Sequence, residues 1–239
     1  MLVLGPTFAP VFGSFAKAAA IWFMRYAAIA VLSLLFVSPL CAADRFFDLN
    51  GFVVWVDPQS SDTFNSSNPN QPFDISFTGK LGYGIGANVF FGDKISIEFA
   101  ASAAEPTAAF GNFGSGQALA STNLKMIPIT AVFQYHFAPS STFDPYIGAG
   151  GAYVLFDQLD NPGDIGHVGV DHIDFKDDVG LALNAGLAVR LTKRVGLFFD
   201  AKYVPIETSA TAVFVTGPDS EQRIEINPVM AAAGVSIRF

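Results

Sequence analysis

The end of the chain, NPVMAAAGVSIRF (227–239), has the pattern of one extended strand in which apolar residues recur at every second position. Successive side chains of a strand point to opposite sides, so two faces can be separated by counting back from Phe239. One face carries Phe239, Ile237, Val235, Ala233, Ala231 and Val229, and the other carries Arg238, Ser236, Gly234 and Ala232. We therefore expect one face to meet an apolar environment and the other to meet a polar one.

Apolar residues are abundant, and they are spread through the chain. They make up 51% of the 239 residues. A membrane-spanning helix needs about 18 or more consecutive apolar residues, and no such run follows residue 43. This composition favours strands in a membrane over helices.

The first residues have the features of a secretory signal. Arg25 precedes an apolar run (26–37), and the small residues Cys41-Ala42-Ala43 follow it. We expect a cleavable signal peptide over 1–43, with translation starting at Met1 or Met24, and a β-barrel domain over 44–239. The alternative is a retained helix from Ala18 to Val37, which would bury Arg25 at a cost of about 3 kcal/mol.

Cleavage after Ala43 fixes the charge and thiol content of the mature chain. It removes Cys41, the only cysteine, so no disulfide is expected. Residues 1–43 hold two bases and no acid, so 11 of the 13 bases and all 21 acids remain, a net charge of −10. This charge disfavours nucleic acid as a partner.

The alternating pattern of the last strand recurs along the chain from Asp44. It predicts eight strands, near 46–57, 73–91, 93–104, 121–137, 143–156, 178–191, 194–211 and 224–239. The connections alternate between tight turns and long polar segments, and the long ones are Pro58–Pro72, Glu105–Ala120, Asp157–Asp177 and Ala212–Arg223. An even number of strands with such connections predicts an all-β, eight-stranded antiparallel transmembrane barrel. A soluble β-sandwich is the alternative.

Three stretches resemble the OmpW family of small outer-membrane barrel proteins: FDPYIGAGGAYVLFD (143–157), DDVGLALNAGLAVRLTKRVGLFFDAKYVPIETSAT (177–211) and EINPVMAAAGVSIRF (225–239). The resemblance implies porin-like passive uptake of small hydrophobic molecules across the outer membrane of a Gram-negative cell. The terminal Phe239 is similar to the signal that the barrel assembly machinery reads, which places both termini in the periplasm. The implied partners are outer-membrane lipid, lipopolysaccharide, the assembly machinery and a small hydrophobic ligand.

The inward-facing residues divide by height into an apolar half and a charged half. Toward the outside, a cup is predicted to bind the ligand through Val54, Val56, Met126, Pro128, Phe156, Val204, Ile206 and Met230. Toward the periplasm, a charged floor is predicted from Asp48, Glu98, Arg190, Asp200 and Arg238. The interior of an eight-stranded barrel is narrow, so the apolar half could equally be packed core, and the facing of the fifth strand, with Val154 and Phe156, is ambiguous.

The charged floor should block straight passage of an apolar solute. Release would then be lateral, near the strands that carry Pro128 and Pro228, because a proline lacks the N–H that a strand ladder needs. Each proline, including Pro205, could also be a harmless gap.

The sequence offers weak candidates for an enzyme site and for a metal site. His136 shows no evident serine or carboxylate partner in the sequence, so no catalysis and no cofactor is expected. His167, Asp171, His172 and Asp174 could bind a metal, but a solvated acidic loop is favoured, and no metal site is predicted. A structural or adhesive barrel acting through its long loops and an outer-membrane acyltransferase are the alternative functions.

Overall fold

The computed structural model describes residues 46–59, 61–64, 73–112, 118–157, 159–160, 170–214 and 219–239. The expected signal peptide, the alternative start at Met24 and the alternative helix from Ala18 to Val37 lie outside these residues. Over the described ranges, no helix is long and apolar enough to cross a membrane.

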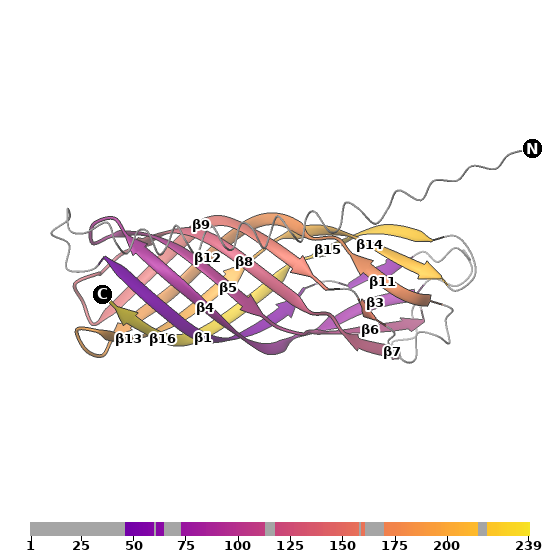
Figure 1. Ribbon diagram of the computed structural model, residues 1–239, viewed down its shortest axis with the longest axis horizontal. Helices are drawn as coiled ribbons and strands as arrows, with labels where there is room; N and C mark the ends of the chain where they lie inside the picture. Colours follow the sequence, from indigo (N-terminus) through magenta and orange to yellow (C-terminus); the bar gives the residue numbers. More distant parts are fainter. Residues whose placement is uncertain are drawn as a thin grey trace, which may run out of the picture. The chain divides into compact units, whose positions relative to one another are not determined.

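Eight antiparallel strands close into a barrel, as the alternating pattern predicts (Figure 1). In chain order they are β1 (Phe47–Pro58), β4 (Lys80–Phe90), β5 (Ile95–Ala103), β8 (Met126–His136), β9 (Phe143–Phe156), β12 (Asp178–Arg190), β13 (Val195–Tyr203) and β16 (Pro228–Arg238). The first and last strands pair, from Asp48↔Arg238 to Pro58↔Pro228, so the barrel has no free edge. The all-β barrel expected from the sequence is confirmed.

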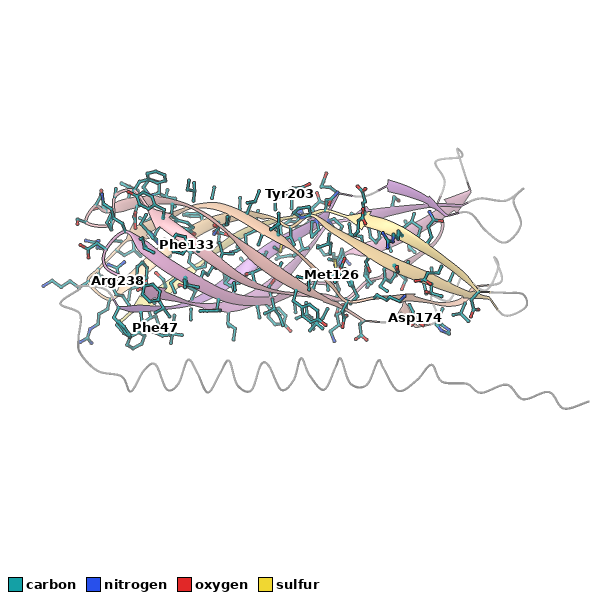
Figure 2. The ribbon with its side chains drawn as sticks, turned by 90° about the horizontal axis from the view of Figure 1, so that it is seen from above. Phe47, Met126, Phe133, Asp174, Tyr203 and Arg238 are labelled. Carbon is teal, nitrogen blue, oxygen red and sulfur yellow. The ribbon has the colours of Figure 1, made fainter. Side chains whose placement is uncertain are left out.

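The two faces of the barrel wall differ in chemistry. On β1, Trp55 is 46% exposed whereas its neighbour Val56 is fully buried. The same alternation exposes large apolar side chains on the other strands, including Phe133 and Tyr203, which point outward in Figure 2. An outer face of this kind is suited to hydrocarbon, and closure of the barrel satisfies its backbone groups internally.

Further strands extend the wall beyond one end of the barrel and form two separate four-stranded sheets. The first contains β2 (Ser61–Phe64), β3 (Phe73–Thr78), β6 (Thr107–Asn112) and β7 (Ala118–Asn123). The second contains β10 (Leu159–Asp160), β11 (Val170–Phe175), β14 (Ile206–Phe214) and β15 (Ser220–Ile226). The segments predicted as long loops are therefore partly strands. Small and polar residues conceal the alternation there, although Ile173, within the predicted loop Asp157–Asp177, is buried beside exposed Asp174.

Two seams separate the two sheets, and a seam here is a line along which neighbouring strands belong to different sheets. One seam begins where β8 and β9 end their pairing, and the other begins where β1 and β16 end theirs. At the β8/β9 seam the last backbone bond of the barrel is Asp157 N to Lys125 O, at 3.0 Å. At the β1/β16 seam it is Gln59 N to Asn227 O, at 3.3 Å. Beyond these bonds, the described strands β7 and β10 are edges of different sheets, and so are β2 and β15.

Candidate functional site in the barrel interior

A cluster of three charged side chains lies at the centre of the barrel. The Lys202 ammonium donates to Glu98 Oε1 at 3.0 Å and to Asp200 Oδ1 at 2.7 Å. Asp200 and Lys202 are two positions apart on β13, so both face inward, and Glu98 reaches them from β5. All three are buried, with exposures of 8% or less. Such charges remain buried only when they are paired and hydrogen-bonded.

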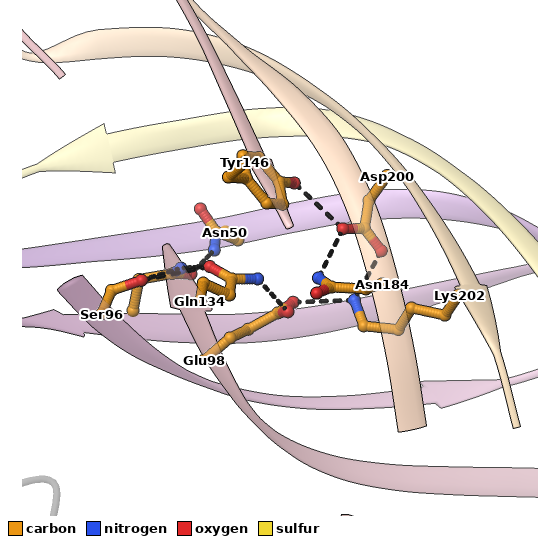
Figure 3. A network of polar contacts seen from close by, with 9 residues as sticks. Asn50, Ser96, Glu98, Gln134, Tyr146, Asn184, Asp200 and Lys202 are labelled. Carbon is orange, nitrogen blue, oxygen red and sulfur yellow. Dashed lines mark hydrogen bonds and ion pairs between the residues drawn. The ribbon is translucent and has the colours of Figure 1, made fainter. Parts of the chain in front are cut away.

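Neutral side chains extend this cluster into a network across the barrel (Figure 3). Asp200 Oδ2 accepts hydrogen bonds from the Tyr146 hydroxyl at 3.0 Å and from Asn184 Nδ2 at 2.9 Å. Glu98 Oε2 accepts a bond from Gln134 Nε2 at 2.8 Å. Gln134 Oε1 accepts from Asn88, and Asn88 Oδ1 accepts from Asn50, each at 2.7 Å. The connected side chains come from β1, β4, β5, β8, β9, β12 and β13, so the network closes the lumen.

The predicted floor residues are divided among three places. Glu98 and Asp200 belong to the central cluster. Asp48 and Arg238 lie opposite each other on β1 and β16, and Asp48 Oδ1 is 3.5 Å from Arg238 Nε. Arg190 contacts neither group in the described structure, because its guanidinium donates to the backbone carbonyls of Pro139 and Ser140 in a tight turn.

The expectation that His136 has no serine or carboxylate partner is wrong. His136 Nδ1 is 2.8 Å from Asp144 Oδ2, and Nε2 is 3.1 Å from Ser96 Oγ. Ser96 lies 40 residues before His136 and Asp144 lies eight residues after it, and the three meet through the registers of β5, β8 and β9, which spacing alone does not reveal. Ser96 is fully buried, and its hydroxyl is also 3.1 Å from Gln134 Oε1. An acyl substrate would have to displace packed side chains to reach it, so we assign the three residues to the network.

Several network members were missed in the predicted site. Lys202 follows Asp200 on the same face, and this spacing could have identified it. Asp144 and Tyr146 were missed because the sequence did not show which residues of the fifth predicted strand, 143–156, face inward. In the structure, the even-numbered residues of β9 face inward, so Val154 and Phe156 are buried as well.

The predicted cup residues form a packed layer above the network. Each is buried: Val54, Val56, Met126, Pro128, Phe156, Val204, Ile206 and Met230. This layer continues between the two sheets through Leu124, Ile173 and Ile226, which are fully buried. The apolar half of the interior is therefore filled by its own side chains in this state. A role for these residues as ligand contacts remains a prediction.

A small cavity lies at the boundary between the two layers. Its volume is about 20 Å³, room for about one water molecule. Its polar side is formed by Asp200, Lys202, Thr130 and Ser102, and its apolar side by Phe52, Val54, Ala100, Pro128, Met230 and Ala232.

Pro128 and Pro228, the prolines predicted to mark the lateral exit, do not face the seams. The N–H and C=O of a strand residue point to the same neighbour. Pro228 O accepts from Val204 N, so the N–H that Pro228 lacks would face β13 and not β1. Lys125 O faces β9, so Pro128, three residues on, faces β5. The strands predicted for lateral exit do border the seams, but they do so because the two sheets diverge.

The residues considered as a metal site, His167, Asp171, His172 and Asp174, lie only partly within the described residues, since His167 is outside them. His172 Nε2 is 3.5 Å from Asp174 Oδ2. In the part of the chain that the structure describes, no group of three His, Cys, Asp or Glu side chains could hold an ion.

Known proteins share both the sequence pattern and the fold. The model of the OmpW family matches residues 46–239. Outer membrane protein W of Vibrio cholerae is 31% identical over 207 residues, covering 84% of this chain and 92% of that protein. The outer-membrane protein y4mB of Sinorhizobium fredii is 35% identical over 115 residues, and this match spans 48% of this chain and 48% of that relative.

A solved structure agrees with this assignment at the level of the fold. The outer membrane protein OprG from Pseudomonas aeruginosa has a TM-score of 0.69 and 22% identity, over 82% of this chain and 96% of that chain. The closed eight-stranded barrel, its apolar outer face and the match over the whole described region lead to one assignment. The chain is an outer-membrane β-barrel protein that belongs to the OmpW family.

Proposed function

We propose that this protein admits small hydrophobic molecules through the outer membrane by passive diffusion and releases them laterally. The observation that carries the proposal is the two-layer interior, in which an apolar layer lies directly above a closed polar network. The apolar layer is chemically suited to a hydrophobic solute, whereas the network is not.

The network makes straight passage expensive. Each carboxylate of the central cluster has a cation and at least one neutral donor. An apolar solute at this level would have to separate these pairs without replacing any of their bonds. The apolar layer imposes no such cost, because a hydrocarbon there exchanges one set of apolar contacts for another.

The seams offer the route into and out of the apolar layer. The two sheets share one buried apolar core, and no backbone pairing between them is described along either seam. Met126 and Phe156 lie directly beneath the bond between Lys125 and Asp157, and Val56 and Met230 lie near the base of the other seam. Separation of the strands at either seam would connect the apolar layer with the surrounding lipid.

The proposed orientation puts the two sheets outside the cell and the tight turns and both termini in the periplasm. Outer-membrane lipid and lipopolysaccharide would surround the barrel. Phe239 is 64% exposed, and its backbone N–H donates to Phe47 O at 2.8 Å, so its ring is presented on an ordered strand end. This position suits recognition by the barrel assembly machinery.

The test is uptake of an apolar fluorescent reporter into proteoliposomes that contain only this protein. Polar, near-isosteric changes in the apolar layer, Val56→Thr and Met126→Gln, should slow uptake. The neutral floor variant Asp48→Asn/Arg238→Gln is the matched control and should leave uptake unchanged, because the solute does not cross the floor. Control of the rate by the floor variant alone would refute lateral release. A rate equal to that of empty liposomes for the unmodified protein would instead favour a structural or adhesive barrel.

A further inference from the structure

The cavity between the two layers has one polar side and one apolar side, and the proposed uptake function does not by itself require this. Lys202 and Thr130 lie on the polar side, whereas Met230 and Val54 lie on the apolar side. A pure hydrocarbon would use only the apolar side. The polar side is therefore available to a second chemical group.

Lys202 retains a hydrogen-bond donor for such a group. An ammonium has three N–H donors, and among the described residues the hydrogen-bond partners of Lys202 are two carboxylates, Glu98 and Asp200. The side chain is 92% buried, since its exposure is 8%, and it lines the cavity. A buried donor without a partner costs free energy, which a ligand oxygen can recover.

Volume and charge limit what that oxygen can belong to. A cavity of about 20 Å³ accommodates one water-sized group, such as a hydroxyl or a carbonyl oxygen. One ammonium beside two carboxylates gives the central cluster a net charge of −1. A ligand carboxylate would bring a second oxygen and a like charge, and both disfavour it.

We propose that this cavity holds the single uncharged oxygen of an amphipathic ligand, a primary alcohol or a ketone, whose hydrocarbon chain extends into the apolar layer. The oxygen accepts the remaining Lys202 N–H and meets the hydroxyl-bearing side chains of Thr130 and Ser102. Met230 and Val54 then contact the first carbons of the chain. This inference rests on the proposed uptake function and narrows its substrate class.

The experiment compares dodecane, 1-dodecanol and dodecanoate. Initial uptake is measured in cells that carry the protein, relative to cells that lack it. The unmodified protein should increase uptake of the alcohol most, uptake of the alkane less and uptake of the carboxylate least. Thr130→Val should lower the alcohol increment about three- to tenfold, the value of one hydrogen bond, and should therefore reduce the ratio of the alcohol increment to the alkane increment by the same factor. Thr130→Ser keeps the hydroxyl and should keep the preference.

A second variant keeps the inference testable if Thr130→Val fails to fold. Glu98→Gln/Asp200→Asn/Lys202→Met removes the donor while leaving no buried charge unpaired, and it should also abolish the preference for the alcohol. Equal increments for alkane and alcohol, unchanged by both variants, would overturn the inference and leave the uptake function standing. No increment for any of the three compounds would overturn both.

Discussion

Replacing Lys202 with Met tests whether the central cluster closes the barrel as a buried, charge-paired unit. Methionine is similar in length and is apolar, so it removes the ammonium with little change in packing. Glu98 and Asp200 then lie buried, at 5% exposure each, without the cation that bridges them. Their hydrogen bonds from Gln134, Tyr146 and Asn184 remain.

The expected loss follows from the cost of leaving a buried charge unpaired. Removal of one partner of a buried ion pair costs about 3–5 kcal/mol. Lys202 bridges two carboxylates, so the loss should fall within or above this range, a change of at least about a hundredfold in the unfolding equilibrium. Glu98→Gln/Lys202→Met leaves one carboxylate, Asp200, with two neutral donors, and should recover a large part of the loss.

The assay is urea unfolding in lipid vesicles, followed by tryptophan fluorescence. Trp55 lies on the outer face of β1 and reports transfer from lipid to water. The midpoint should fall for Lys202→Met and rise again for the double variant. A loss below about 1 kcal/mol for Lys202→Met, as for a solvated surface pair, would refute the account of a dry, charge-paired network.

Three further outcomes are expected. Deletion of Phe239, or Phe239→Asp, should reduce the heat-modifiable folded band in outer-membrane fractions, and an unchanged band would mean that another element is recognised during assembly. Leu124→Ala should lower the free energy of unfolding by about 2–5 kcal/mol, because the fully buried side chain leaves a cavity in a packed layer; a negligible loss would indicate an open cup instead. Protease added to intact cells should cut within Pro58–Pro72 or Asp157–Asp177 and spare the turn at Phe91–Lys94, and the reverse pattern would invert the proposed orientation.

The eight barrel strands were predictable because one face of each strand had to be apolar. In a strand this requirement places an apolar residue at every second position, a pattern that is visible in the sequence. At the last strand, the facing inferred from Phe239 backwards is the facing observed, with Ile237 and Val235 exposed and Ser236 buried. The strands of the two sheets were less visible. Segments such as Thr107–Asn112 are short, and the small side chains of Thr107, Ala108 and Ala109 leave the alternation of apolar residues weak there.

The candidate site was predictable in its composition and not in its connections. The position of each residue along its strand was enough to assign Asp48 and Glu98 to the polar half of the interior and Val54 and Met126 to the apolar half. Which side chains pair depends on strand register, and this is why the contacts of His136 with Asp144 and of Lys202 with Glu98 emerged only from the structure. The seams likewise lie where the pairing of β8 with β9 and of β1 with β16 ends, and local sequence does not mark these ends. Prolines were the only local signal of a weak wall, and Pro128 and Pro228 face β5 and β13 instead of the seams.

The most direct test of lateral release is to fasten the seams chemically. Paired cysteines are placed at the base of each seam, Lys125→Cys with Asp157→Cys and Gln59→Cys with Asn227→Cys, and are joined by a short, reducible thiol cross-linker. The control joins Glu207→Cys and Glu225→Cys, which lie opposite each other within one sheet. If release is lateral, fastening both seams abolishes uptake of the apolar reporter, reductant restores it, and the control link has no effect. Unchanged uptake with both seams fastened would contradict lateral release.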